Sequence, residues 1–326
     1  MSGAPVLVIG DVMTDVVARV DDPLALGSDT AAHVQTHQGG AGANVAAWLA
    51  ALDVPVRFVG RVGADPFGTE SVQVLRTGGV DVRVAVDDVR ATGTVVVLVG
   101  ADGERTMLPD AGANSGLTTD DVAAGDVASA GWLHVSGYTL LNPGSRDAGS
   151  AALAAARAAG VRTSVDVASA APLQALGGKE FVRLTEGTDL VFCTLDEAEV
   201  LVGTRDPELA VARLTADYRE VVLKLGRAGA RWASEGAAPV TVPACPPSGA
   251  VVDSTGAGDA FCAAYLAVTL AVTLPVTSDG GAVADALAAG CRAGAALVTR
   301  VGTRPVPPPR DHARSPQDPL SPGSPR

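Results

Sequence analysis

The feature that most constrains this chain is a turn of small residues that leads directly into a long apolar segment. Residues 253–259 have the sequence Asp-Ser-Thr-Gly-Ala-Gly-Asp, and residues 260–274 are almost entirely apolar. This pattern predicts a loop that opens a buried helix, whose first backbone N–H groups have no partner within the helix. Because Gly256, Ala257 and Gly258 carry little or no side chain, they leave room for an anion beside those N–H groups. Asp259 would then lie at the mouth of an anion site, although a tight turn with Asp259 as the helix cap explains this stretch equally well.

Short apolar runs alternate with helix-like segments along most of the chain. Strand character is found at residues 6–10, 57–63, 132–136, 161–167, 189–192 and 221–225, and helical character at residues 45–52, 150–159, 196–201, 209–217 and 282–299. Continuous apolar strands are typical of a parallel sheet that is buried on both faces. The alternation therefore predicts a doubly wound α/β fold, with a mainly parallel sheet between two layers of helices.

Two regions depart from this alternation. Residues 93–100 and 105–108 predict a hairpin with no helix between its strands. We expect a small β-sheet, formed roughly by residues 15–38 and 84–110, to project from the main sheet as a lid. Between residues 304 and 326, eight of 23 residues are proline and apolar residues are nearly absent. This composition predicts a disordered tail after a domain of residues 1–303.

Composition and missing motifs exclude several functions. The net charge of −12 argues against nucleic acid or an anionic membrane as the main partner. The four cysteines form no C-x-x-C pair, and residues 1–10 lack the features of a secretory signal, so we expect a reduced, cytoplasmic protein. The sequence contains no G-x-x-x-x-G-K-[ST], G-x-G-x-x-G or H-E-x-x-H motif. A P-loop site, a dinucleotide-binding Rossmann site and a zinc-protease site are therefore not expected.

Two motifs together resemble one known family. Residues 253–259 continue as Ala-Phe-Cys-Ala-Ala-Tyr-Leu, and the whole run resembles the C-terminal signature of the ribokinase-like (PfkB) carbohydrate and nucleoside kinases. Residues 39–44, Gly-Gly-Ala-Gly-Ala-Asn, resemble the N-terminal signature of the same family. Further similarity extends the resemblance over about residues 6–304. It implies phosphorylation of a hydroxymethyl group of a sugar or sugar-like substrate by ATP, and a homodimer formed through the lid.

The resemblance implies a role for each matching residue. Asp259 would be the base that takes the proton from the substrate hydroxyl, and Gly256, Ala257 and Gly258 would form the anion hole for the γ-phosphoryl group. The hydroxyls of the acceptor would be held by Asp15, Gly40 and Asn44, with Asp11 close by.

The remaining implied roles concern the nucleotide and its metal ions. Glu197 would organise Mg²⁺ and phosphate through water, and Thr194 stands where the family usually has the Asn of Asn-x-x-Glu. The strand end and loop beside ATP are represented by Lys224, Gly226 and Gly229, and Asp253 and Thr255 stand where many members bind a monovalent cation such as K⁺.

Three departures from the family pattern bear on the acceptor. Ribokinases usually have Asn, Lys and Glu at the positions of Met13, Ala41 and Gly137, where these side chains help to hold ribose. Their loss favours an acceptor other than free ribose, and a pocket opened at Gly137 would suit a nucleoside such as pseudouridine or adenosine. From another class, the alternative is a catalytically silent sugar- or nucleotide-binding regulator, against which the retained Asp259 argues.

Overall fold

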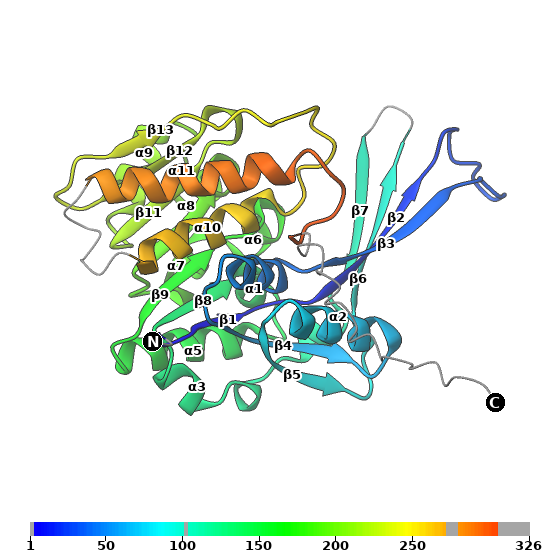
Figure 1. Cartoon of the computed structure of the whole chain (residues 1–326), viewed down its shortest axis with the longest axis horizontal. Helices are drawn as coiled ribbons and strands as arrows, with labels where there is room; N and C mark the ends of the chain where they lie inside the picture. Colours follow the sequence, from blue (N-terminus) through cyan, green and yellow to red (C-terminus); the bar gives the residue numbers. More distant parts are fainter. Residues whose placement is uncertain (1–2, 101–103, 272–279, 306–326) are drawn as a thin grey trace, which may run out of the picture.

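The apolar runs of the sequence form one large sheet. The computed structural model describes residues 3–100, 104–271 and 280–305, and in this part of the chain the large sheet has nine strands (Figure 1). In spatial order they are β13 (Val240–Val242), β12 (Ala230–Ser234), β11 (Glu220–Lys224), β10 (Leu190–Thr194), β9 (Arg162–Asp166), β8 (Trp132–Ser136), β1 (Val6–Ile9), β4 (Val56–Gly63) and β5 (Asp81–Asp87). All neighbours pair in parallel except those of β12, which runs antiparallel to β11 and β13. The predicted doubly wound α/β fold is confirmed.

Helices cover both faces of this sheet. One layer contains α1 (Ala41–Ala51), α2 (Pro66–Thr77), α10 (Ala257–Ala271) and α11 (Gly280–Leu297). The other contains α3 (Ala124–Ala128), α4 (Gly137–Leu141), α5 (Arg146–Ala158), α6 (Ala170–Leu176), α7 (Gly178–Leu184), α8 (Leu195–Val202) and α9 (Pro207–Leu214). Short 3₁₀ turns occur at η1 (Gly112–Gly116), η2 (Thr119–Asp121) and η3 (Gly226–Ala228).

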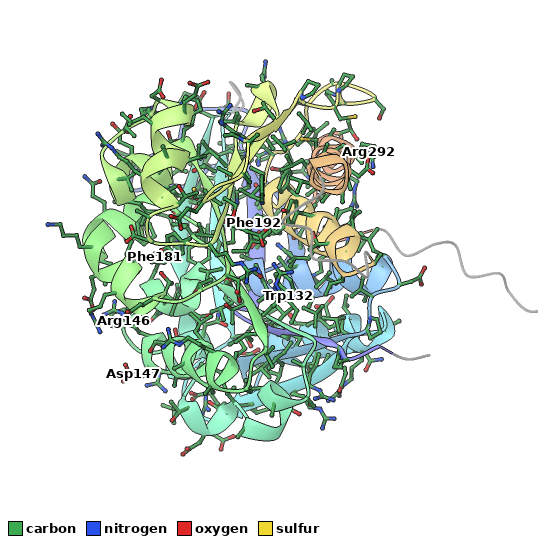
Figure 2. All side chains as sticks on the ribbon, turned by 90° about the vertical axis from the view of Figure 1, so that its left-hand side faces the viewer. Trp132, Arg146, Asp147, Phe181, Phe192 and Arg292 are labelled. Carbon is green, nitrogen blue, oxygen red and sulfur yellow. The ribbon has the colours of Figure 1, made fainter. Side chains whose placement is uncertain are left out.

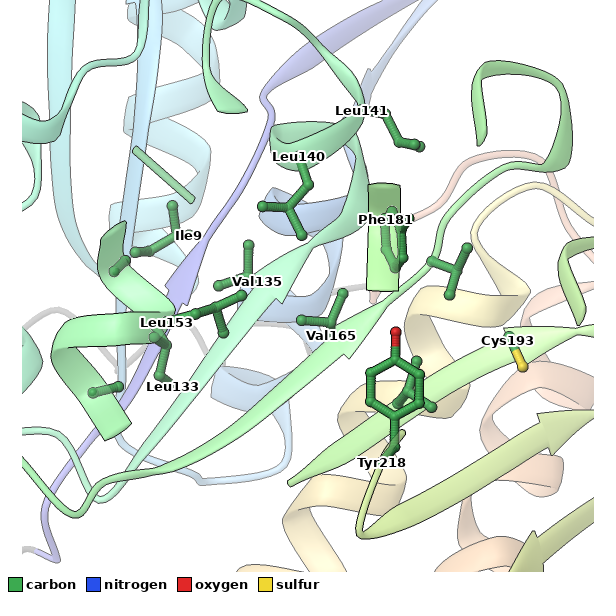
Figure 3. Close-up of a cluster of buried hydrophobic side chains, with 14 of the residues drawn as sticks. Ile9, Leu133, Val135, Leu140, Leu141, Leu153, Val165, Phe181, Cys193 and Tyr218 are labelled. Carbon is green, nitrogen blue, oxygen red and sulfur yellow. The ribbon is translucent and has the colours of Figure 1, made fainter. Parts of the chain in front are cut away.

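Alternate side chains of each strand enter the two cores. Trp132 and Phe192 are buried on the side of α10 and α11, whereas Arg292 lies on the outer face of α11 (Figure 2). On the opposite side, Val135 and Val165 point from the sheet toward the helices that carry Leu140, Leu153 and Phe181 (Figure 3). Burial on both faces explains why strands such as β1 and β10 are almost entirely apolar.

A second sheet projects from one end of the layered part (Figure 1). Its strands, in spatial order, are β3 (His33–Gly39), β2 (Met13–Arg19), β6 (Gly93–Val99) and β7 (Arg105–Asp110). The predicted hairpin is confirmed, because β6 and β7 are antiparallel neighbours. The predicted range 84–110 begins too early, since residues 81–87 form β5 at the edge of the large sheet, paired in parallel with β4. Alternating polar and apolar residues in β5 resemble a half-exposed strand of either sheet, so the pattern alone does not assign it.

The fold includes residues beyond the predicted domain end at residue 303. The indole Nε1 of Trp48 donates to the backbone oxygen of Thr303 at 3.0 Å, and Arg304 Nη2 donates to the backbone oxygen of Gly39 at 2.9 Å. Arg304, which the composition assigns to the tail, is therefore part of the fold. The rest of the predicted tail, residues 306–326, lies outside the described residues.

The order of the strands fixes where a ligand site lies. From β1 the chain builds β4 and β5 on one side, and then returns to build β8 to β11 on the other. Ligands of such sheets bind at the carboxyl ends of the strands where the order reverses, which here is between β1 and β8. No helix in the described residues is long and apolar enough to cross a membrane. The expected cytoplasmic location stays a prediction.

Candidate active site

Asp259 lies in the first turn of α10 and is held by the N-terminal motif. Asn44 Nδ2 donates to Asp259 Oδ2 at 2.8 Å, joining residues that are 215 positions apart in the sequence. Thr303 Oγ1 lies 2.9 Å from Asn44 Oδ1 and 2.9 Å from the backbone oxygen of Gln38, so its single proton can be donated to either. The two sequence motifs and the end of the described chain therefore meet at one carboxylate.

The surroundings of Asp259 change its acidity. Burial raises the pKa of Asp259 to about 8, with the carboxylates of Asp166 and Asp11 adding to the rise and the Asn44 hydrogen bond opposing it. An aspartate with this pKa is a stronger base than one with the ordinary value near 3.9. It also keeps its proton below about pH 8, so the acidity of this group sets a pH limit on any reaction in which it acts as a base.

Residues 256–258, called the anion loop from here on, are small because other groups approach them closely. Gly256 has φ +78°, and a Cβ there would lie 2.8 Å from Thr303 Cβ. A Cβ on Gly258 would lie 3.3 Å from the Lys224 ammonium nitrogen. The predicted buried helix is confirmed, but it begins earlier than the apolar segment, at Ala257. The Ala257 backbone N–H already donates to the Ser254 oxygen at 3.2 Å, a local bond that the sequence did not predict.

A buried ion pair lies next to the anion loop. Lys224, at the end of β11, places Nζ 2.6 and 2.8 Å from the two carboxylate oxygens of Asp166, at the end of β9. Burial alone would lower the pKa of Lys224, but the carboxylates of Asp166 and Glu197 raise it well above its ordinary value. Lys224 therefore remains a cation. The sequence prediction gave Asp166 no role, although its position at the end of a predicted strand was the available signal.

Thr194 and Glu197 form a capping box at the start of α8. Glu197 Oε2 accepts from the Thr194 backbone N–H at 2.8 Å, and the Glu197 N–H donates to Thr194 Oγ1 at 3.4 Å. Thr194 thus fulfils a local role with a hydroxyl in place of the amide expected from the family. The described residues contain no group of three or more His, Cys, Asp or Glu side chains that could hold a metal. The buried carboxylate of Glu197 is a suitable donor for Mg²⁺, which beside nucleotides is usually bound by one or two carboxylates together with phosphate oxygens and water.

The loop between β11 and β12 needs glycine at two positions. Gly226 and Gly229 have φ values of +57° and +103°, and a Cβ on Gly229 would lie 2.0 Å from the backbone oxygen of Val242. Their geometry follows from the chain itself, and their predicted contact with a nucleotide stays a prediction.

Asp11 ties the first strand to the first helix. Its carboxylate accepts from the backbone N–H groups of Ala41 at 3.0 Å and Gly42 at 3.2 Å, and from Ser136 Oγ at 3.0 Å. Gly40 has φ +93°, and a Cβ there would lie 2.5 Å from the Asp11 backbone oxygen. The N-terminal glycine motif therefore packs against the end of β1, and Asp11 fixes the position of this loop.

Asp15 projects from β2 of the small sheet toward the same region. Burial raises the pKa of Asp15 to about 6, with Arg304 lowering it and Asp11 and Asp253 raising it. The charged groups of Asp15, Asp11, Asp253 and Arg304, which belong to four separate segments, therefore lie near one another. Arg304 was missed by the sequence prediction because its proline-rich surroundings indicate a tail.

Two positions differ from the predicted pocket. Met13 is buried with Sδ 3.2 Å from Asn114 Nδ2, and a Cβ on Gly137 would lie 2.4 Å from the backbone oxygens of Asp166 and Val167. The predicted opening at Gly137 is therefore wrong, because backbone atoms occupy the space beside it. The preference against free ribose stays a prediction.

Asp253 and Thr255 are engaged by an arginine of the small sheet. Arg105 Nη1 donates to Asp253 Oδ1 and, at 3.2 Å, to Thr255 Oγ1, while Nη2 donates to the Val252 backbone oxygen at 3.1 Å. The same Asp253 oxygen accepts from the Thr255 N–H at 2.9 Å. A metal ion at this oxygen would meet the guanidinium, so the pair does not fit the monovalent cation that the resemblance implies.

Comparisons with known proteins agree with this geometry. The profile of the pfkB family carbohydrate kinase matches residues 4–310. A fructokinase of Klebsiella pneumoniae is 34% identical over 244 residues, which are 70% of this chain and 76% of the relative. The crystal structure of an adenosine kinase from Sinorhizobium meliloti has a TM-score of 0.82 at 27% identity, covering 93% of this chain and 96% of that one. A fructokinase from Vibrio cholerae, solved with fructose, ADP and calcium ion bound, has a TM-score of 0.77 at 28% identity and covers 93% and 95% of the two chains.

The family match spans nearly the whole chain and includes both ends of the site, from the Asn44 loop to the start of α10. The chain belongs to the pfkB family of carbohydrate kinases and is an ATP-dependent phosphotransferase that acts on an alcohol group of a sugar.

Proposed function

We propose that the enzyme transfers the γ-phosphoryl group of ATP to a hydroxymethyl group of a furanose-type sugar, with Asp259 as the base. The observation that carries this proposal is the contact between Asn44 Nδ2 and Asp259 Oδ2 at the start of α10. It orients a buried carboxylate of raised pKa beside a loop of small residues. Such a group takes the hydroxyl proton as the bond to phosphorus forms.

The acceptor is held on the side of the small sheet. The sugar hydroxyls are bound by the carboxylate of Asp15, the backbone groups of Gly40 and the side-chain amide of Asn44. Asp11 holds the Gly40 loop in place through its hydrogen bonds to that loop. Support comes from the charge interactions that link Asp15 to Asp11 and Arg304. Held there, the hydroxymethyl group points toward Asp259.

The nucleotide lies on the opposite side of the anion loop, along Lys224, Gly226, Gly229 and Thr194. Lys224 remains charged through its contact with Asp166 and lies beside Gly258, where phosphate charge would need a cation. Mg²⁺, bound near Glu197, would neutralise phosphate charge. The fructokinase solved with ADP and a calcium ion supports a nucleotide with a divalent ion at this site.

A nucleoside is the second candidate acceptor, and the likeness to an adenosine kinase supports it. We also propose a homodimer formed through the small sheet. Its outer strands carry exposed apolar side chains at Val34, Met107 and Leu108, which are 58%, 48% and 55% exposed.

The test is a screen of ADP formation by purified protein with Mg²⁺, ATP and one acceptor at a time. The panel contains fructose, ribose, 2-keto sugar acids, adenosine and pseudouridine, and the Asp259→Asn variant serves as the control for contaminating kinases. Acceptor-dependent ADP formation by the wild type alone supports the proposal. No acceptor-dependent ADP formation across sugars and nucleosides would refute it.

A further inference from the structure

One ion pair connects the small sheet to the catalytic loop across a long stretch of sequence. Arg105, the first residue of β7, binds Asp253, which is 148 positions away and lies three residues before the anion loop. The side chain of Arg105 is 24% exposed and that of Asp253 is 11% exposed. Both partners are thus largely withdrawn from water, where a charge-assisted contact is stronger than on an open surface.

The guanidinium binds three acceptors of one turn. Besides Asp253 Oδ1 it reaches Thr255 Oγ1 and the Val252 backbone oxygen, so it holds residues 252–255 as a unit. Gly256, with its positive φ, follows directly and opens α10. The position of the anion loop therefore depends on the conformation of a turn that Arg105 fixes.

The turn also needs positive charge. The Asp253 carboxylate adds to the rise in the pKa of Asp15, so the two negative charges lie close enough to repel each other. A carboxylate with little access to water is costly unless it is paired with a cation. Arg105 supplies this cation at the oxygen where the family resemblance implies K⁺.

We propose that Arg105 is a built-in replacement for the monovalent cation: it positions residues 252–255 from the small sheet and makes the kinase independent of K⁺. The inference rests on the proposed function, because it concerns the loop assigned to the phosphoryl group. It further implies that the charge reaches the turn only when the small sheet lies against it, since Arg105 belongs to β7. Closure of the small sheet and ordering of the anion loop are then one event.

The first test compares wild-type enzyme in KCl and in choline chloride at equal ionic strength. Choline is too large to enter a cation site between a carboxylate and a hydroxyl. We expect kcat and KM for ATP to agree within about twofold in the two salts, since the loss of one charged contact would change them by roughly tenfold or more. Activation of the wild type by K⁺ of tenfold or more would overturn the proposal.

The second test removes the guanidinium. In choline chloride, Arg105→Ala should lose about ten- to hundredfold in kcat, which is the loss expected when a hydrogen bond to a charged group is removed. KCl should restore part of this kcat. Arg105→Lys should keep most of the activity in both salts because it retains the charge. Arg19→Ala is the matched control: Arg19 is exposed and lies on the same rung of the small sheet, where both Arg19 and Arg105 pair with Val99. It should behave like the wild type.

A third measurement does not depend on turnover. A cation that binds only the folded state raises the melting temperature, so KCl should stabilise Arg105→Ala relative to choline chloride and leave the wild type unchanged. Equal melting temperatures of Arg105→Ala in the two salts, or a K⁺ effect of the same size in the wild type, would contradict the proposal. If no acceptor is phosphorylated, the proposed function fails, whereas this arm still reports whether Arg105 occupies a cation site.

Discussion

At the scale of single residues, the Asp259 carboxylate is the group on which the proposed phosphoryl transfer depends most. Replacing it by asparagine keeps the size of the side chain and leaves an oxygen that can accept from Asn44. The variant should fold and bind ATP but lose about 10²- to 10⁴-fold in kcat, which is the usual contribution of a general base. Steady-state assays with the best acceptor of the screen measure this, and a loss of less than threefold would show that another group takes the proton.

The same substitution should affect stability in a pH-dependent way. The folded state holds the Asp259 proton up to about pH 8, whereas an unfolded chain releases it near pH 3.9. Between these values the folded state binds more protons, so this group contributes less stability as pH rises. The asparagine side chain of Asp259→Asn does not titrate. The melting temperature of this variant, relative to that of the wild type, should therefore rise from pH 5 to pH 8.

Thermal melts of the two proteins at several pH values test this expectation. A difference in melting temperature that stays constant from pH 5 to pH 8 would mean that Asp259 titrates normally in the folded protein.

At the scale of elements, the proposed role of the anion loop can be tested by a substitution at Gly258, where the loop packs against Lys224. Gly258→Val should place methyl groups at the Lys224 ammonium, since even a Cβ there lies 3.3 Å from Nζ. We expect kcat/KM for ATP to fall far more than acceptor affinity, because the displaced cation and crowded N–H groups belong to the phosphate side.

The matched control for that variant is Gly249→Val, at a position where a Cβ would meet nothing within 4 Å. Acceptor affinity can be followed by calorimetry while ATP turnover is assayed. Equal losses in the two quantities for Gly258→Val would make the loop a structural element only.

The large sheet was predictable at this scale because most of its central strands are rich in apolar residues and alternate with helix-like segments. β5 was assigned to the wrong sheet and the antiparallel β12 and β13 were not predicted, since short, partly exposed strands lack that signature. For the site, the family motifs predicted Asp259 and Asn44, which the structure brings together. Asp166, Arg105 and Arg304 belong to neither motif, and each owes its place in the site to a partner far along the chain.

At the scale of the whole molecule, the end of the described chain closes the site. Thr303 is hydrogen-bonded to Trp48 and Asn44, and Arg304 is hydrogen-bonded to Gly39. A chain that ends at Gly302 should melt about 5 °C or more below the wild type, since several hydrogen bonds of roughly 1 kcal/mol each are lost. It should also lose turnover, because Asn44 then holds Asp259 without support.

The control for this truncation is a chain that ends at Pro305, which keeps both residues. It should match the wild type in melting temperature and turnover, as a segment of this composition forms no packed core. If both truncations behave alike, the contacts of Thr303 and Arg304 do not contribute.

The pH dependence of kcat/KM for the acceptor is the decisive test of Asp259 as the base, because this quantity reports the essential groups of the enzyme form that meets the acceptor. At constant, saturating concentrations of Mg²⁺ and ATP, we expect kcat/KM for the acceptor to rise with pH and to level off above about pH 8, where Asp259 has lost its proton. A profile that is already flat between pH 5 and pH 9 would contradict the assignment of a buried Asp259 as the base.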